Sequence, residues 1–180
     1  MKYEMMEKFN GLRPQDVLVL LKIMTFLDDK WLLADIASSL AISVSETSNA
    51  LERCRICGLI DQRKRTVNKL AMRDFLIYGL KYVYPAQVGG PSRGIPTAYS
   101  AEPIRSRIVE GSESLVWPYY KGTRRGNAVT PLYPTVPRIV EHQPVLYEWL
   151  VIVDTLRLGK ARERSIAVEE LEKRLNVKGE

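Results

Sequence analysis

Apolar residues recur at helical spacing through most of the first half of the chain. With the positions of Pro14, Gly58 and Pro85, this periodicity predicts four helices, at about residues 14–27, 33–40, 43–57 and 66–84. The first of them starts with Pro14, which fits the first turn of a helix because its missing N–H costs nothing there. Residues 1–84 are therefore expected to form one helical domain.

The junction between the second and third predicted helices carries local signals of its own. A short turn at residues 41–43 joins the two helices. Ser43 and Glu46 match the Ser-x-x-Glu capping box, in which each side chain satisfies a free backbone N–H at the start of a helix. Gly58 follows the third helix at the position that glycine favours, and Leu59-Ile60 is predicted to be a short strand.

The pattern changes after Pro85. Residues 85–144 hold nine of the ten prolines and six of the eleven glycines, so long helices are not expected there. Leu115–Tyr120 and Ala128–Leu132 are predicted to pair as a β-hairpin around a turn at residues 121–127. Pro118 favours an edge strand, and Gly89–Gly94 is predicted to be a turn.

Helical periodicity returns at the C-terminus, where residues 145–158 and 160–175 are expected to form a pair of helices separated by Gly159. The predicted fold is therefore mainly α. It consists of a helical domain (1–84), an irregular Pro/Gly-rich segment with the hairpin (85–144) and the C-terminal helices (145–180).

The net charge of +6 is concentrated in one window of the sequence. Seven basic residues and one acid, Asp61, lie between Arg53 and Arg73, so this window alone accounts for +6. A concentrated basic stripe attracts the phosphates of nucleic acid, although such runs are also found as plain solvated surfaces.

Residues 33–60, LADIASSLAISVSETSNALERCRICGLI, resemble the DNA-reading segment of winged helix-turn-helix regulators. The preceding LRPQDVLVLLKIM looks like the first helix of the DNA-binding domain in MarR-type members, so the resemblance covers about residues 12–62. It implies a small side chain at Ala37, where the two helices pack. It also implies core positions at Ile42, Thr47, Leu51, Cys54 and Ile60.

In that family the third helix enters the major groove. Position by position, the resemblance places Ser43 and Val44 at the start of this helix and Ser45, Ser48, Asn49, Glu52 and Arg53 on its outward face. Of these, the predicted DNA contacts are Ser43, Val44, Ser45, Ser48, Asn49 and Arg53. Contacts to the phosphate backbone of the DNA are expected from Arg53, Arg55, Arg63, Lys64 and Arg65. The chain departs from the family at the wing, because only residues 61–66 separate Ile60 from the next helix and the Asp-x-Arg signature is absent. A truncated or missing wing is expected.

Two further basic residues, Arg124 and Arg125, lie in the predicted turn of the hairpin. They are candidates for a displaced wing that touches DNA. A solvated basic turn is the alternative.

The sequence gives little support for metal binding, cofactor binding or catalysis. Cys54 and Cys57 have metal-ligand spacing, but there is no second pair and His142 is the only histidine, so structural cysteines are expected. Neither a metal, a cofactor nor a catalytic group is predicted. Two cysteines on one helix suit a reduced, cytoplasmic setting. No membrane span is expected, because Glu148 and Asp154 interrupt the most apolar run.

The sequence thus predicts a sequence-specific DNA-binding transcriptional regulator, as a repressor or an antitoxin-like autoregulator, rather than an enzyme. The apolar stripes at 67–84 and 146–156 favour a homodimer. An effector ligand or a partner protein is left open. The alternative is a non-catalytic interaction module that uses the helix-turn-helix as a docking platform for another protein.

Overall fold

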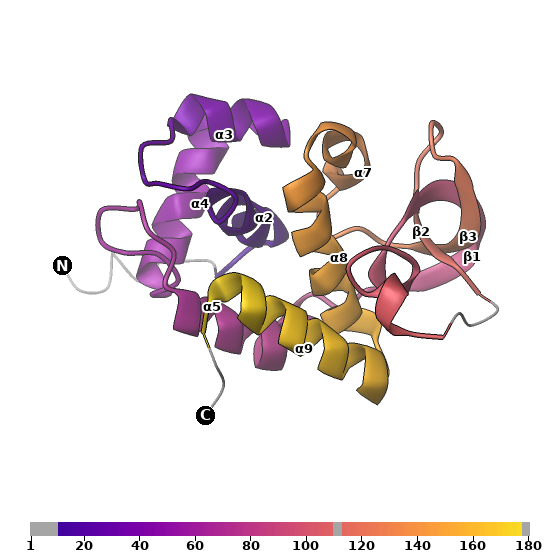
Figure 1. Ribbon diagram of the computed structural model, residues 1–180. Coiled ribbons are helices and arrows are strands. Elements are labelled where there is room, and N and C mark those ends of the chain that lie inside the picture. The colour runs from indigo at the N-terminus through magenta and orange to yellow at the C-terminus, as the bar shows by residue number, and fades with distance from the viewer. Residues whose placement is uncertain (1–10, 110–112, 178–180) are drawn as a thin grey trace. The chain divides into compact units, whose positions relative to one another are not determined.

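The computed structural model describes residues 11–109 and 113–177 (Figure 1). In this part the chain is mostly helical, with one small three-stranded sheet, in agreement with the mainly α prediction. Contacts divide the chain into two units, residues 1–68 and residues 69–180. Residues 69–84 therefore group with the middle and C-terminal segments, whereas the sequence had placed them with the first helices.

The first unit is built around α2 (Pro14–Ile23), against which α3 (Leu33–Leu40) and α4 (Val44–Ile56) pack (Figure 1). Five consecutive α2 residues, 17–21, are fully buried, so α2 lacks the polar face of a surface helix over this stretch.

The predicted packing positions of this unit are confirmed as buried: Ala37, Ile42, Thr47, Leu51, Cys54 and Ile60. Ala41 ends α3 in the left-handed conformation, with φ 53°. The Ser43 hydroxyl then caps α4 by accepting a hydrogen bond from the Glu46 backbone N–H at 3.1 Å. The Glu46 carboxylate bonds to Gln15 and Arg53, so only the Ser43 half of the predicted capping box is present.

After α4 the chain forms a minimal two-stranded turn. Ile60 and Val67 make an isolated antiparallel bridge, and the Asp61 N–H donates to the Thr66 carbonyl at 2.9 Å. Inside the turn, the Asp61 carboxylate accepts from the backbone N–H groups of Arg65 at 2.7 Å and Thr66 at 2.9 Å. Six residues are thus enough to close a loop but not to extend two strands.

In the second unit, the helix expected over 66–84 is shorter and interrupted. It consists of α5 (Lys69–Asp74), a π-helical segment (Phe75–Gly79) and α6 (Leu80–Val83). Two features explain the interruption: Gly79 is a poor helix former, and the Arg164 guanidinium donates to the Ile77 carbonyl within the segment.

The predicted C-terminal pair is confirmed as α8 (Pro144–Leu158) and α9 (Ala161–Leu175), preceded by α7 (Val136–Ile139). The apolar stripe of α8 is buried within this unit, and so are Leu76, Ile77 and Leu80 of the interrupted helix. The stripes from which a homodimer was expected therefore mostly build the core of the second unit. No helix in the described ranges is both long and apolar enough to cross a membrane.

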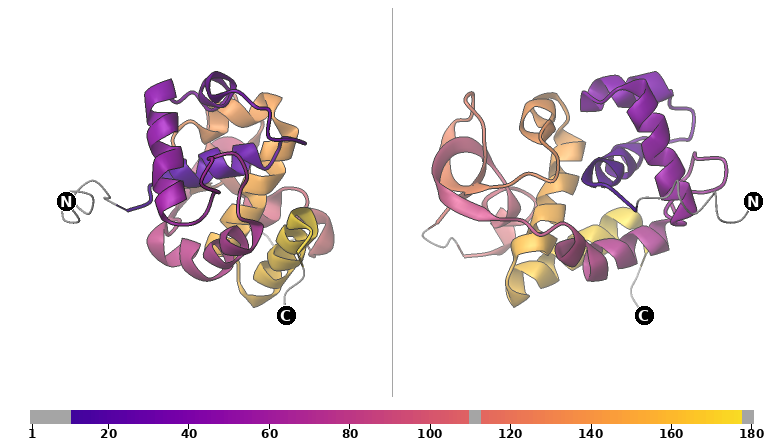
Figure 2. Two further views of the ribbon diagram at one scale, coloured as in Figure 1. Left: turned by 90° about the vertical axis from the view of Figure 1, so that its left-hand side faces the viewer. Right: turned by 180° about the vertical axis from the view of Figure 1, so that it is seen from behind.

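The sheet differs from the predicted hairpin. It consists of β1 (Val88–Pro96), β2 (Leu115–Pro118) and β3 (Arg124–Val129). β1 runs antiparallel to both other strands, while β2 and β3 pair parallel, so that the three strands close on themselves (Figure 2). The hairpin of 115–120 with 128–132 and the turn at Gly89–Gly94 were wrong, and β2 is not an edge strand.

Glycines permit this closure. A Cβ on Gly94 would lie 1.9 Å from the Trp117 carbonyl oxygen, and one on Gly126 would lie 2.4 Å from the Ser114 carbonyl oxygen. In the sequence these glycines favoured turns. In the structure they let neighbouring backbones approach closely enough for three short strands to form a closed sheet.

A buried polar cluster fixes the sheet to α8. The Asp154 carboxylate, 1% exposed, accepts from Thr97 Oγ1 at 2.8 Å and Trp117 Nε1 at 2.6 Å. Arg157 Nη1 donates to its other oxygen at 2.7 Å, and Arg157 Nε donates to the Tyr84 carbonyl. One carboxylate thereby joins β2, the chain after β1 and α8.

Candidate nucleic-acid interface

The outward face of α4 is exposed and polar. Its buried face consists of Thr47, Ala50, Leu51 and Cys54, which leaves the opposite side of the helix to solvent. The residues exposed at its start and on that side are Ser43, Val44, Ser45, Ser48 and Asn49. The structure therefore brings five of the predicted contact residues together on one surface, with short side chains that let another molecule approach the helix.

The start of α4 is held firmly. Besides the Ser43 cap, Thr47 Oγ1 donates to the Ser43 carbonyl at 2.9 Å, and Gln15 of α2 donates to Glu46 at 3.1 Å. The free N–H groups at a helix start carry partial positive charge, which favours a nearby phosphate. Rigid support of this kind is what a surface that reads another molecule requires.

Arg53 does not belong to that surface. Its side chain is 11% exposed and forms ion pairs with Asp16, which is fully buried, and Glu46, both at 2.6 Å. The Arg53 hydrogen bond is the main cause that lowers the pKa of Glu46. Sequence reasoning placed Arg53 on the outward face, but the buried carboxylate of Asp16 draws it inward to tie α4 to α2.

Arg55 and Lys64 both form ion pairs with Glu52. Glu52 accepts from Arg55 at 2.6 Å and pairs with Lys64 at 2.5 Å, which joins α4 to the turn at 61–66. The Arg55 hydrogen bond and then that of Lys64 lower the pKa of Glu52 to about 2. Glu52 therefore stays ionised at ordinary pH and offsets part of the charge of its two basic neighbours.

The turn also contains Arg63 and Arg65. The Arg65 guanidinium stacks on the Trp31 ring, 4.5 Å from its centroid, and donates to the Trp31 carbonyl at 2.8 Å. Arg63 is exposed and has no side-chain ion pair within the described ranges. The residue of this turn that is most available to a partner is therefore Arg63.

These ion pairs reduce the local positive charge of the basic window, residues 53–73. In the sequence its positive charge was opposed by Asp61 alone. In space Asp16, Glu46 and Glu52, which all lie outside the window, pair with three of its basic residues. The local excess of positive charge is smaller than the sequence indicated.

Arg124 and Arg125 lie in the second unit, in β3 rather than at the tip of a turn. Neighbouring side chains of a strand point to opposite faces. Arg124 lines a pocket, whereas Arg125 stands directly opposite Arg93 of β1. Arg93 was not predicted as a contact residue, because residues 89–94 read as a turn in the sequence.

The two cysteines are free thiols. Cys54 is buried, and burial raises the pKa of its thiol well above the ordinary value. Cys57 is exposed at the end of α4. The part of the chain that the structure describes holds no group of three or more histidine, cysteine or acidic side chains placed to bind a metal ion.

Comparison with known proteins adds no relative. No family model matches the chain, and neither a curated protein nor a solved structure shows significant similarity to it.

Proposed function

We propose that the chain is a sequence-specific DNA-binding transcriptional regulator that places α4 in the major groove. In this proposal α3, residues 41–43 and α4 form a helix-turn-helix, and the turn at 61–66 is a truncated wing. The observation that carries it is the exposed polar face of the rigidly held α4. The major groove is wide enough for such a helix, and carboxamide and hydroxyl groups can bond to base edges there.

Each residue has a proposed role. Asn49 faces the bases, since a carboxamide can bond adenine through two hydrogen bonds. Ser43, Val44, Ser45 and Ser48 flank it at the groove. Arg63 contacts phosphate, with lesser contributions from Arg55, Lys64 and Arg65, which already hold protein partners. Arg53 acts inside the fold and is not part of the proposed surface.

A second phosphate contact is proposed at Arg93 and Arg125 of the sheet. Both are exposed, directly opposite each other and without an acidic partner in the described ranges. Like charges facing each other across two strands repel, and an anion between them would relieve the repulsion. Arg124, which points to the other side, is left out of this surface.

The proposal is tested by separating base reading from phosphate binding. We expect Asn49→Ala to reduce the preference for the operator over random DNA by about 1–3 kcal/mol, because a bidentate base contact is lost. Arg63→Ala is expected to weaken both DNAs equally and to lower the salt slope by about one unit, because phosphates are alike in every sequence. Competition binding between the operator and a scrambled duplex measures both effects.

Arg162→Ala serves as the matched control, since it removes one exposed charge from α9 in the second unit. It should leave affinity and preference unchanged. If Asn49→Ala keeps the full operator preference, α4 is not the reading helix.

A homodimer is proposed as the form that reads paired half-sites. The helical segment 69–83 keeps large apolar side chains exposed, Leu70, Tyr78, Tyr82 and Val83, and they offer an interface. Light scattering should give twice the mass of the 20.6 kDa chain. A monomer at micromolar concentration would contradict the dimer.

A further inference from the structure

A pocket of about 280 Å³ opens in the second unit beside the closed sheet. It is bordered by the end of β1, the 3-10 turns Ala98–Ser100 and Arg105–Arg107, residues 113–114 and the start of β3. Its volume lies slightly below the usual range for ligand sites, about 300–1,000 Å³, and suits a small metabolite rather than a nucleotide.

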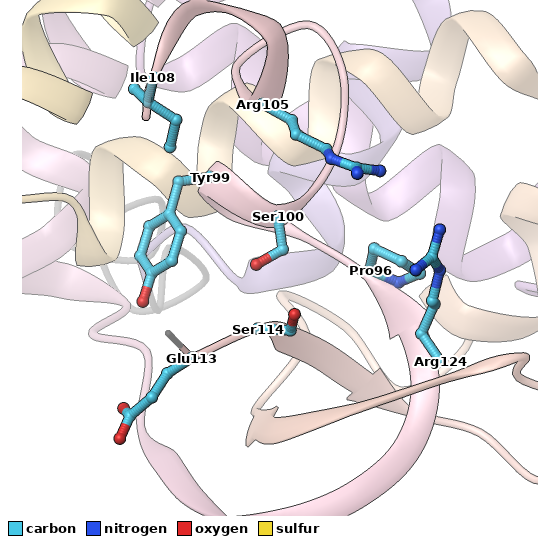
Figure 3. A pocket seen from close by; sticks show the side chains of 8 residues that line it. All are labelled: Pro96, Tyr99, Ser100, Arg105, Ile108, Glu113, Ser114 and Arg124. Atoms are coloured by element: carbon cyan, nitrogen blue, oxygen red, sulfur yellow. The ribbon is translucent and has the colours of Figure 1, made fainter. Parts of the chain in front are cut away.

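One end of this pocket is cationic. Figure 3 shows the guanidinium groups of Arg105 and Arg124 on the same side of it, reaching toward one another from two different segments. The Arg124 side chain forms no ion pair with any residue in the described ranges. A guanidinium presents a planar fork of N–H donors that matches a carboxylate. Two guanidinium groups together therefore make a strong binding site for one carboxylate.

The other end is acidic and polar. The Tyr99 hydroxyl and the Glu113 carboxylate lie on the opposite side of the pocket from the two arginines (Figure 3). Asn127 Nδ2 donates to one Glu113 oxygen at 3.2 Å and leaves the other oxygen able to accept. Burial, followed by the charges of Glu113 and Glu163, raises the pKa of Tyr99, so its phenol stays neutral as a hydrogen-bonding group.

Between the two ends lie Ser100 and Ser114 (Figure 3). Ser100 Oγ accepts from the Leu115 N–H at 2.8 Å, which leaves its own proton free to be donated. The Ser114 carbonyl accepts from the Asn127 N–H at 2.7 Å, and Gly126 packs against the same carbonyl. Strand pairing thus fixes the floor of the pocket, and a pre-formed floor lowers the cost of binding.

From this arrangement we propose that the pocket binds a small zwitterion with the chemistry of an amino acid. Its carboxylate lies between Arg105 and Arg124, and its ammonium group faces Glu113 and the Tyr99 hydroxyl. Opposite charges at the two ends of one small pocket favour a ligand with both charges over a simple anion, which would leave the Glu113 end unmatched. The proposal concerns the second unit alone and does not depend on DNA binding.

The test is ligand binding by the full chain. Each standard L-amino acid at millimolar concentration is screened by thermal denaturation, and hits are titrated by calorimetry. We expect at least one to bind, and its analogues lacking either the amine or the carboxylate to bind at least about tenfold more weakly, because each loses a charge-assisted contact. Absence of any binder overturns the proposal, and so does an amine-free analogue that binds equally well.

Variants locate the site. Arg124→Ala should weaken binding about tenfold or more, and Arg124→Lys should restore only part of it, because the fork is lost. Glu113→Gln should weaken binding of the amino acid but not binding of its amine-free analogue. Arg138→Ala is the matched control, since it removes an exposed arginine of α7 that does not line the pocket, and it should bind the amino acid normally. Unchanged binding by Arg124→Ala, in a variant that melts like the parent protein, would place the ligand elsewhere and overturn the assignment.

Discussion

Replacing Asp154 with alanine should destabilise the second unit more than replacing any other surface or polar residue of that unit. The change removes the carboxylate that accepts from Thr97, Trp117 and Arg157. The Arg157 side chain is 3% exposed, so its charge would be left buried without its acidic partner. Breaking a buried pair in this way costs about 3–5 kcal/mol.

The measurement is urea denaturation followed by tryptophan fluorescence, to which Trp117 contributes directly. Asp74→Ala is the matched control, because it removes an acid of the same unit whose side chain is 62% exposed and paired only at the surface with Arg73. It should cost at most about 1 kcal/mol. If Asp154→Ala loses no more than Asp74→Ala, the cluster does not hold the sheet on α8.

Arg53→Ala should have the second large effect, and it should act on stability rather than on DNA recognition. Asp16 is fully buried and receives two hydrogen bonds from the Arg53 side chain, at 2.7 and 2.6 Å. Without Arg53 its charge keeps, among the described residues, the bond from the Arg13 N–H. We expect the free energy of unfolding of the first unit to fall by about 3–5 kcal/mol.

Arg55→Ala provides the comparison, since it removes an arginine two residues along α4 whose partners among the described residues are the half-exposed Glu52 and the exposed Gln62. Its expected cost is small, because an ion pair in contact with solvent contributes little to stability. Chemical denaturation of both variants separates the two roles. A small loss of stability in Arg53→Ala, accompanied by a lower salt slope of DNA binding, would return Arg53 to the DNA surface.

The first unit could be predicted from the sequence in considerable detail. Its helices are short, local and marked by clear boundaries, such as Pro14 and Ser43, and its core positions are those that the helix-turn-helix resemblance implied. The orientation of Arg53 could not be predicted, because its partner Asp16 lies on another helix and reads as an ordinary first-turn acid. An ion pair between helices leaves no periodic pattern in the sequence.

The sheet could not be predicted for a different reason. A closed three-stranded sheet needs glycines where backbones touch, and in a sequence such glycines are indistinguishable from those of turns. Because Gly94 reads as part of a turn, neither β1 nor its residue Arg93 was predicted. The pocket residues Tyr99, Arg105 and Glu113 come from separate segments that only this closure assembles. By contrast, the α8 and α9 helices were predictable because their apolar stripes are regular and local.

The most direct test of the central claim is selection of the full chain against a pool of random duplex DNA, followed by binding of the selected duplex over a range of salt concentrations. The account predicts that one sequence is enriched, that its affinity falls steeply as salt rises because phosphate contacts release counterions, and that Asn49→Ala loses the enrichment. A pool that stays random after selection, or binding that does not respond to salt, would contradict DNA reading by α4.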